Sequence, residues 1–394
     1  MKELSRIASA VQASTTMAID AMFKQMKADG VDVIGFGAGE PDFNTPDNIK
    51  AAGIAAIEQN VTRYTPAAGT VELRQAVCGR MKADYGLEYK PSQVVVSSGA
   101  KHLVYLALRA VVNPGDEVIL PAPYWVSYIE LIKMVGGVPV VVTATEAEHF
   151  KLTAEKLSAA ITPRTKAILL NNPSNPTGMM YDREELEAIA AVCTQADIYV
   201  ISDEIYACLA YDGRTFTSFA SLSADAKERT ILVNGVSKAY AMTGWRIGYA
   251  CANDVIAKVM ANYVSHSTGS PVAISQRAAA VALSGSQAEI ETMRQAFEQR
   301  RNYIVERMNA IPGVSCIQPE GAFYVMMNLE QLLGKTIHGV EITNDDVFAD
   351  AFLKYGLVAV VPGSGFGAPN FVRWSYATSM ENIKEGLDLS LIHI

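Results

Sequence analysis

The stretch IYVISDEIY, residues 198–206, places an acidic residue directly after a short run of apolar residues. Similar runs, rich in Val and Ile and bounded by Gly, Pro, Asn or Asp, recur between residues 91 and 250 and alternate with longer stretches typical of helices. This pattern is typical of parallel strands that are buried on both faces of a sheet and connected by helices, so it predicts an α/β fold. The predicted strands are residues 93–97, 117–120, 138–142, 167–170, 198–202 and 230–234.

The chain changes character near residue 285. A long charged stretch, residues 287–309, predicts a helix, and two apolar runs after it, at 322–327 and 357–361, predict further strands. Because these elements form a separate α+β pattern, we expect a second, smaller domain that the N-terminal segment joins. The expected domains are a large one over residues 46–284 and a small one formed by residues 1–45 with 285–394.

The composition excludes several classes of protein. The 394 residues are 50% hydrophobic and 19% charged, an ordinary globular composition, and the net charge of −8 argues against nucleic acid as a partner. No apolar run reaches the roughly 18 residues of a membrane span, and the charged N-terminus carries no secretory signal, so we expect a cytoplasmic protein without membrane contact. The five cysteines are scattered, with no CxxC pair, which favours reduced thiols over disulfides or a metal site.

Residues 235–248, GVSKAYAMTGWRIG, follow the last predicted strand of the large domain. A single lysine such as Lys238 is more often a solvated surface residue than a catalytic one. Its setting favours a catalytic role, because small residues flank it and Arg246 lies eight residues further on. A lysine that attacks an aldehyde needs an accessible, deprotonated amine, and a nearby arginine can bind the anionic group of a cofactor.

Three other predicted strands also end in polar or glycine-rich segments. Asp203 follows one strand, where it could cap the next helix or bind a protonated ring nitrogen. The loop NNPSNPTG at 171–178 and the turn SSGAK at 97–101 follow two more, and each alone could be ordinary loop chemistry. Ligands of such sheets bind at the carboxyl ends of the strands, and a glycine-rich turn before a helix can bind phosphate.

Together these segments resemble the class I and II aminotransferases, in the fold type I group of pyridoxal-phosphate enzymes, and the resemblance covers nearly the whole chain. It implies a mostly parallel seven-stranded sheet in the large domain and pyridoxal 5′-phosphate as the cofactor.

In the family a lysine forms an internal aldimine with the cofactor and moves a proton between the substrate Cα and the cofactor C4′, and Lys238 matches this lysine. Asp203 and Tyr206 match the residues that bind the ring nitrogen and the ring oxygen O3′. The other implied cofactor contacts are the backbone of Gly99, Ala100 and Lys101 with Arg246 at the phosphate, Ser237 beside the lysine, Trp125 on the ring face and Asn175 at O3′.

The resemblance also implies the substrate contacts. Arg373, in the segment FVRWS, matches the arginine that binds the α-carboxylate of the amino acid, and buried arginines are rare unless paired. Gly39, in the segment GAGEPD, matches a glycine whose backbone meets the same carboxylate, next to Asn175 and Trp125. Tyr64 matches a tyrosine that reaches the phosphate of the neighbouring subunit, which implies a homodimer.

Among the family members, the chain most resembles the bacterial aspartate aminotransferases. There, a lysine after the phosphate-binding turn and a hydroxyl near the N-terminus bind the distal carboxylate; Lys101 and Ser14 match these, and Thr16 is a second candidate for the hydroxyl. Members that also accept prephenate carry a lysine where this chain has Gln12, which argues against prephenate as a substrate and leaves its use open. The expected reaction is the transfer of an amino group from L-aspartate to 2-oxoglutarate with ping-pong kinetics.

Other activities stay open at this point. A carbon–sulfur β-lyase shares Lys238, Asp203, Arg246 and Arg373. An aminotransferase that prefers aromatic amino acids or alanine is a further alternative. A pyridoxal-phosphate-binding transcription regulator is disfavoured, because no DNA-binding helix-turn-helix region precedes the matched segments. A nicotinamide oxidoreductase is also disfavoured, because no GxGxxG motif opens the first strand–helix unit.

The last six residues, LSLIHI at 389–394, are also the in-frame reading of a transposon end used in sequencing libraries. Residues 380–388 before them predict a polar-faced helix that ends without a cap. We therefore expect that the hexapeptide replaces the native end of that helix, and we assign no function to His393.

Overall fold

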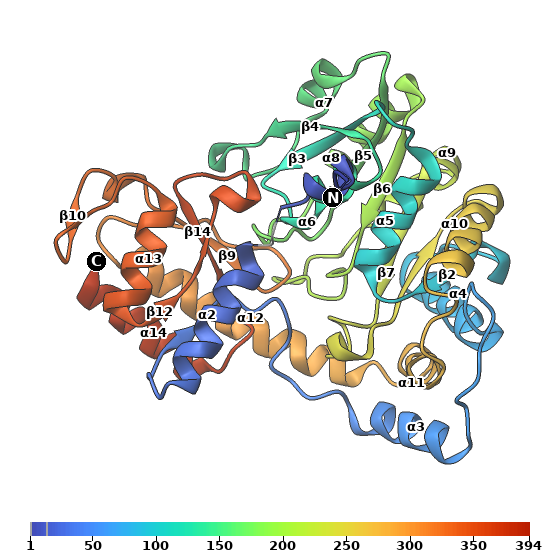
Figure 1. Ribbon diagram of the computed structural model, residues 1–394, viewed down its shortest axis with the longest axis horizontal. Helices are drawn as coiled ribbons and strands as arrows, with labels where there is room; N and C mark the ends of the chain where they lie inside the picture. Colours follow the sequence, from blue (N-terminus) through green and yellow to red (C-terminus); the bar gives the residue numbers. More distant parts are fainter. Residues whose placement is uncertain (1, 13–14) are drawn as a thin grey trace.

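The computed structural model describes residues 2–12 and 15–394. The strands of its largest sheet are β2 (Val94–Ser97), β3 (Glu117–Ala122), β4 (Val138–Thr143), β5 (Thr165–Asn171), β6 (Tyr199–Asp203), β7 (Thr230–Gly235) and β8 (Gly248–Cys251). Their order in the sheet is β2-β8-β7-β6-β5-β3-β4 (Figure 1). All neighbouring strands are parallel except β8, which runs antiparallel to both β2 and β7. The predicted α/β fold with a mostly parallel seven-stranded sheet is therefore confirmed.

Helices cover both faces of this sheet. Those on one face are α5 (Ala100–Val111), α6 (Ser127–Met134) and α10 (Asp254–Ser267), and those on the other are α3 (Asp47–Glu58), α4 (Val71–Tyr85), α7 (Ala154–Ala160), α8 (Arg183–Ala196), α9 (Ala224–Arg229) and α11 (Ala273–Ser284). On β5, for example, Leu169 packs with the first group, whereas Ile168 and Leu170 pack with α7 and α8. Because both faces of the inner strands are buried, these strands are apolar along their length, which explains the continuous apolar runs in the sequence. The edge strand β4 differs, since Val138 and Val141 are exposed.

The N-terminal and C-terminal parts of the chain pack together beside this sheet (Figure 1). β1 (Ile34–Gly35) pairs in parallel with β12 (Val358–Ala359), and an antiparallel sheet joins β13 (Val361–Pro362), β14 (Phe371–Ser375) and β9 (Tyr324–Asn328). The exact division into residues 46–284 and 1–45 with 285–394 stays a prediction. The remaining elements are α1 (Arg6–Ser9), α2 (Thr15–Ala28), α12 (Ala288–Asn309), β10 (Thr336–Ile337), β11 (Val340–Glu341), α13 (Asp345–Gly356) and α14 (Met380–His393).

Three local predictions differ from the structure. Strand β8 has no counterpart among the predicted runs, because it is only four residues long and begins inside the glycine-rich segment that follows Lys238. The run predicted as one strand at 357–361 forms two, β12 and β13, which pair with different sheets. Helix α14 continues to His393, with Ser390 buried and its hydroxyl donating to the carbonyl of Gly386, so the predicted helix end at residue 388 is wrong.

The five cysteines are free thiols, and Cys193, Cys251 and Cys316 are buried. Among the described residues, no group of three or more His, Cys, Asp or Glu side chains lies close enough together to hold a metal ion. In the same part of the chain, no helix is long and apolar enough to cross a membrane.

Candidate active site

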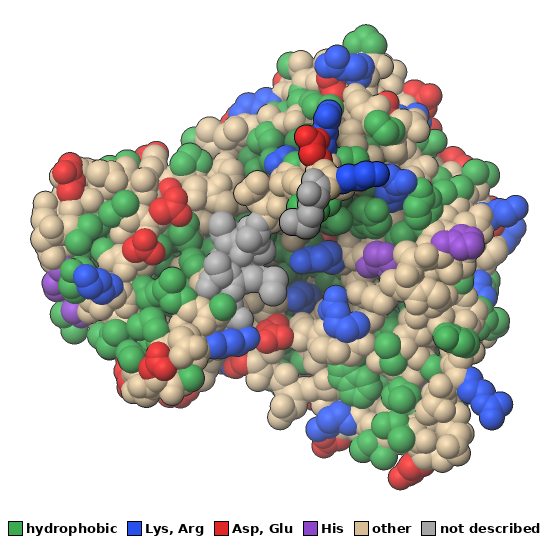
Figure 2. Space-filling model, viewed as in Figure 1, with side chains coloured by type: hydrophobic (Ala, Val, Ile, Leu, Met, Phe, Trp, Pro, Cys, Tyr) green, Lys and Arg blue, Asp and Glu red, His purple; other side chains and the backbone are tan. Residues whose placement is uncertain are grey.

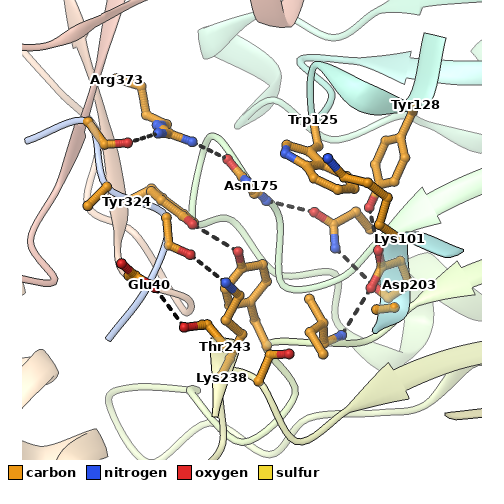
Figure 3. Close-up of a pocket in the computed structure, with 18 of the residues that line it drawn as sticks. Glu40, Lys101, Trp125, Tyr128, Asn175, Asp203, Lys238, Thr243, Tyr324 and Arg373 are labelled. Atoms are coloured by element: carbon orange, nitrogen blue, oxygen red, sulfur yellow. Dashed lines mark hydrogen bonds between the residues drawn. The ribbon is translucent and has the colours of Figure 1, made fainter. Parts of the chain in front are cut away.

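A cavity of about 350 Å³ lies at the carboxyl edge of the seven-stranded sheet. Asn171 and Asp203, the last residues of β5 and β6, line it together with Lys238, three residues beyond the end of β7. Gly39 and Arg373, from the N-terminal and C-terminal parts of the chain, line it as well (Figure 3). On the face shown in Figure 2, Lys and Arg side chains gather in the central hollow of the surface. The fold thus brings segments that are far apart in the sequence to one edge of the sheet.

The amine of Lys238 points into this cavity (Figure 3). It donates a hydrogen bond to the carbonyl of Gly39, while the nearby Glu40 carboxylate accepts a 2.6 Å hydrogen bond from the Thr243 hydroxyl. Burial lowers the pKa of Lys238 to about 8, and the negative charge of Glu40 opposes that shift. At neutral pH such an amine is deprotonated in a far larger fraction of molecules than an ordinary lysine, as a nucleophile requires.

Asp203 is buried at the floor of the cavity, with 3% of its surface exposed. Burial raises its pKa to about 6, and two hydrogen bonds oppose the shift: one of 2.7 Å from the Tyr128 hydroxyl and one of 3.2 Å from the backbone N–H of Ile205. The positive charge of Lys238 acts in the same direction as these bonds. Tyr128 was not among the predicted site residues, although it lies three residues after Trp125 and packs edge-on against that ring.

A cradle for an anion lies where β2 meets α5. Gly99 precedes α5 with a φ of +89°, and a Cβ at this position would lie 2.5 Å from Nη2 of Arg246. Two backbone carbonyls hold the Arg246 guanidinium: Nη2 donates to Ser98 at 3.2 Å and Nη1 to Thr243 at 2.9 Å. The glycine therefore allows the guanidinium to approach the free N–H groups at the start of α5. A helix N-terminus beside an arginine is suited to bind phosphate.

The cavity carries a surplus of positive charge although the chain as a whole is acidic. Four cationic side chains and two carboxylates line it: Lys101, Lys238, Arg246, Arg373, Glu40 and Asp203. None of the four cations forms an ion pair within the described part of the chain, whereas surface Lys and Arg side chains commonly do. An unpaired cluster of this kind fits ligands that carry several negative charges, such as a phosphorylated cofactor together with a dicarboxylate. The residues present therefore fit pyridoxal 5′-phosphate.

Arg373 on β14 is 2% exposed and held in a fixed position. Its Nη1 donates to Oδ1 of Asn175 at 2.9 Å and its Nη2 to the carbonyl of Gly37 at 2.7 Å. The guanidinium lies 4.5 Å from the ring centroid of Tyr324, a residue that the sequence analysis did not single out. Because its position is fixed in advance, the guanidinium can bind a carboxylate with both nitrogens at a small entropic cost.

Trp125 and Lys101 lie next to each other on the cavity wall (Figure 3). The Lys101 ammonium is 4.8 Å from the Trp125 ring centroid, and partial burial together with the charge of Arg246 lowers the pKa of Lys101. Tyr206 is buried nearby, and its hydroxyl lies 2.9 Å from the Tyr324 hydroxyl. Ala100 and Ser237 complete the predicted residues that line the cavity.

Other predicted residues are not brought to the cavity within one chain. Tyr64 is 99% exposed and does not line the cavity. Gly99 borders it only through Arg246. Ser14 lies outside the described residues, as does the side chain of Thr16, and Gln12 is exposed, with its N–H bonded to a carboxylate oxygen of Glu130. The roles predicted for these residues stay predictions.

Comparisons with known proteins agree with this geometry. The sequence model of the family described as aminotransferase class I and II matches residues 31–389. An aspartate aminotransferase of Bacillus sp. (strain YM-2) is 49% identical, over 98% of this chain and 98% of that protein. An aspartate/prephenate aminotransferase of Cereibacter sphaeroides is 48% identical, over 98% of this chain and 97% of that protein. The solved structure of the aspartate aminotransferase from Rhizobium meliloti matches with a TM-score of 0.96 at 42% identity, over 100% of this chain and 99% of that one.

Proposed function

The chain belongs to the class I and II aminotransferases, and we propose that it transfers the amino group of L-aspartate to 2-oxoglutarate. The observation that carries the proposal is the pair of separate cationic groups in the cavity, Arg373 and Lys101, with Lys238 also reaching into it (Figure 3). A dicarboxylate needs one cation for each carboxylate, whereas an amino acid with a neutral side chain needs only one. Three relatives named aspartate aminotransferase, 49%, 48% and 48% identical, support the same choice of substrate.

Pyridoxal 5′-phosphate, on which this family depends, would supply an electrophilic carbon for the lysine amine and a ring that accepts electrons from the substrate Cα. Asp203 would bind its ring nitrogen, and Tyr206 with Asn175 its ring oxygen, because these groups lie at the ends of β5 and β6. Trp125 would stack on the ring face. Arg246, Ser237 and the backbone N–H groups of Ala100 and Lys101 would hold the phosphate at the start of α5, and Gly99, whose own N–H is bonded to the carbonyl of Ser97, would leave room for it.

Lys238 is the group that moves protons. Its amine, with a pKa lowered by burial to about 8, would take the proton from the substrate Cα and deliver it to the cofactor carbon C4′. A base is most effective when its pKa lies near the working pH, and this value lies much closer to neutrality than that of an exposed lysine. The backbone carbonyl of Gly39 and the carboxylate of Glu40 orient the amine and stabilise its charged form.

The two substrates use the same subsites in turn, which explains the expected ping-pong kinetics. Arg373 binds the α-carboxylate first of aspartate and then of 2-oxoglutarate, beside the backbone of Gly39 and the amide of Asn175. Lys101 binds the distal carboxylate in both half-reactions, helped by the hydroxyl of Ser14, which lies outside the described residues. Some relatives are named aspartate/prephenate aminotransferase, but Gln12 still argues against prephenate as a substrate here.

A homodimer completes the proposal. Tyr64 is 99% exposed, which is rare for a large aromatic side chain, and Ile54, Ile57 and Val71 are exposed by 58%, 56% and 53% on the neighbouring helices α3 and α4. A two-fold contact over this surface would bury these side chains and bring Tyr64 of the partner subunit to the phosphate site. A cytoplasmic location, expected from the sequence, stays part of the proposal.

The reaction products distinguish transfer from carbon–sulfur lysis. Purified protein supplied with the cofactor, aspartate and 2-oxoglutarate is expected to form glutamate and oxaloacetate in equal amounts. Incubation with cystathionine is expected to release no pyruvate. Pyruvate release without glutamate formation would instead assign the chain to the β-lyases and would overturn the proposal.

A further inference from the structure

Tyr324 on β9 links two groups of the site that bind different ligands. It is fully buried, and its hydroxyl lies 2.9 Å from the hydroxyl of Tyr206, the residue proposed to bind the cofactor ring oxygen (Figure 3). Its ring lies under the guanidinium of Arg373, 4.5 Å from ring centroid to Cζ, where the substrate α-carboxylate would bind. A cation over an aromatic ring is attracted by the negative charge of the ring face, so the two groups are electrostatically coupled.

The surroundings of the Tyr324 hydroxyl keep it neutral. Burial raises the pKa of Tyr324, with Arg373 and the hydrogen bond to Tyr206 opposing the shift and Glu40 adding to it. Besides these three groups, Tyr128 and Tyr376 couple electrostatically to Tyr324, and Gly39 is so close that a Cβ there would lie 3.2 Å from the hydroxyl. A neutral phenol has one proton to donate and can also accept a hydrogen bond.

The hydrogen bonds of the two tyrosines can be satisfied in only one order when a ring oxygen binds to Tyr206. Tyr206 has a single proton, so if it donates to the ring oxygen it must accept from Tyr324. Donors in such a chain strengthen one another, since each hydrogen bond polarises the next. A stronger donor at the ring oxygen favours negative charge there and lowers the proton affinity of the nearby Lys238 nitrogen.

From this geometry we infer that Tyr324 is a positioning residue that couples carboxylate binding at Arg373 to the hydrogen bond that Tyr206 gives to the cofactor. The inference rests on the proposed function. A carboxylate bound to Arg373 neutralises the positive charge over the Tyr324 ring, so the hydroxyl becomes a weaker donor and the proton affinity of the Lys238 nitrogen rises. Part of the response of the cofactor to substrate therefore passes through Tyr324.

The test is a pH titration of the visible absorbance of the cofactor-bound protein, with and without the unreactive dicarboxylate maleate. The Tyr324→Phe variant keeps the ring but removes the hydroxyl. Without maleate, the midpoint pH of its absorbance titration is expected to rise by about half a pH unit relative to wild type. The upward shift caused by maleate is expected to fall to less than half of its wild-type size. The matched control is Tyr181→Phe, which removes a buried hydroxyl that accepts a hydrogen bond from the N–H of Leu152 and does not line the cavity, and it should behave as wild type.

A double-mutant cycle separates this coupling from a general disturbance. If Tyr324 acts through Tyr206, adding Tyr324→Phe to Tyr206→Phe changes the midpoint by much less than it does alone. The inference would be overturned if the shifts of the two substitutions were additive. It would also be overturned if Tyr324→Phe left both the midpoint and the maleate response unchanged, or if it lowered the midpoint. Failure of the proposed function is distinguishable, because the wild-type protein would then form no glutamate from aspartate and 2-oxoglutarate, whereas the titration requires only bound cofactor.

Discussion

The hydroxyl of Tyr128 donates a 2.7 Å hydrogen bond to Oδ2 of Asp203, and the two residues are only 2% and 3% exposed. An isolated carboxylate at such a depth is protonated easily, because burial disfavours the charged form. The Tyr128 bond acts against that tendency and fixes the orientation of the carboxylate. A protonated ring nitrogen needs a charged, correctly placed partner, so Tyr128 supports the proposed role of Asp203 without contacting the substrate.

Replacing Tyr128 by Phe removes the hydrogen bond and keeps the packing. The pKa of Asp203, raised by burial to about 6, then rises further, by about 0.5 to 1 unit. The acidic limb of the profile of kcat/KM against pH should move to higher pH by the same amount, while activity at pH 8 falls by no more than about threefold. An acidic limb that stays in place would contradict this role of Tyr128.

Replacing Lys101 by Ala separates dicarboxylates from other substrates. The substitution removes the ammonium but keeps the backbone N–H at the start of α5. Because a hydrogen bond to a charged group contributes about 1.5 to 3 kcal/mol, kcat/KM for aspartate should fall by about 10- to 100-fold. The value for alanine, which has no distal carboxylate, should change by less than about threefold. Equal losses for both amino acids would refute the assignment of Lys101.

Replacing Arg373 by Lys should lower the activity on aspartate and on alanine alike. Lysine cannot bind a carboxylate with two nitrogens, and it loses the contacts to Asn175 and Gly37. Aspartate and alanine share the α-carboxylate, so both should lose about 100-fold or more in kcat/KM. Steady-state kinetics on both amino acids measure this, and a loss confined to aspartate would exchange the proposed roles of Arg373 and Lys101.

Replacing Gly99 by Ala tests the phosphate cradle. The new Cβ would meet the Arg246 guanidinium at 2.5 Å, and the positive φ of +89° adds backbone strain. Affinity for pyridoxal phosphate, measured by fluorescence titration of the cofactor-free protein, should fall by at least about tenfold. Gly115→Ala is the matched control, because its φ is +90° but nothing lies within 4 Å of the added Cβ. Similar losses in both variants would show that backbone strain, and not the cradle, is responsible.

Glu204, next to Asp203, carries a pH-dependent cost in stability. Its Oε1 accepts hydrogen bonds from Ser202, Ser218 and Phe219. Its Oε2 has no hydrogen-bond partner among the described residues. Burial raises the pKa of Glu204 to about 7. Between the unfolded pKa of 4.5 and about 7 the folded state holds a proton that the unfolded state releases, so this group lowers stability as the pH rises through that window. Glu204→Gln cannot ionise and should be more stable than wild type by about 1 to 3 kcal/mol at pH 8.

The measurement is the melting temperature of the cofactor-free protein at pH 4.5 and pH 8. The advantage of Glu204→Gln should be present at pH 8 and nearly absent at pH 4.5, where the wild-type side chain is protonated in the folded state and about half protonated in the unfolded state. An advantage of the same size at both pH values would show that the carboxyl is not the cause.

Local sequence patterns predict the sheet and most of the cavity. Asp203, Lys238 and Arg246 stand in segments that directly follow apolar strands, and parallel strands bring their carboxyl ends to one edge. Their positions therefore follow from the order of elements along the chain. Strand β8 was missed because four residues that start within a glycine-rich segment give no periodic pattern.

Contacts between distant segments could not be predicted in this way. Tyr128 and Asp203 are 75 residues apart, and Tyr206 and Tyr324 are 118 apart. In the sequence Tyr128 and Tyr324 resemble any aromatic residue of a buried helix or strand, because the hydrogen bonds that distinguish them depend on how the elements pack. The role of Tyr64 stays a prediction for the same reason, since it depends on a second subunit.

The absorbance spectrum of the purified, cofactor-loaded protein shows whether Lys238 holds the cofactor and whether aspartate reacts with it. We expect a visible band from cofactor linked to Lys238, and this band should be absent in Lys238→Ala. L-aspartate should shift it into the near ultraviolet, and 2-oxoglutarate should restore it. Alanine at the same concentration should shift the band far more slowly than aspartate. A visible band that aspartate leaves unchanged, or no band at all, would contradict the account.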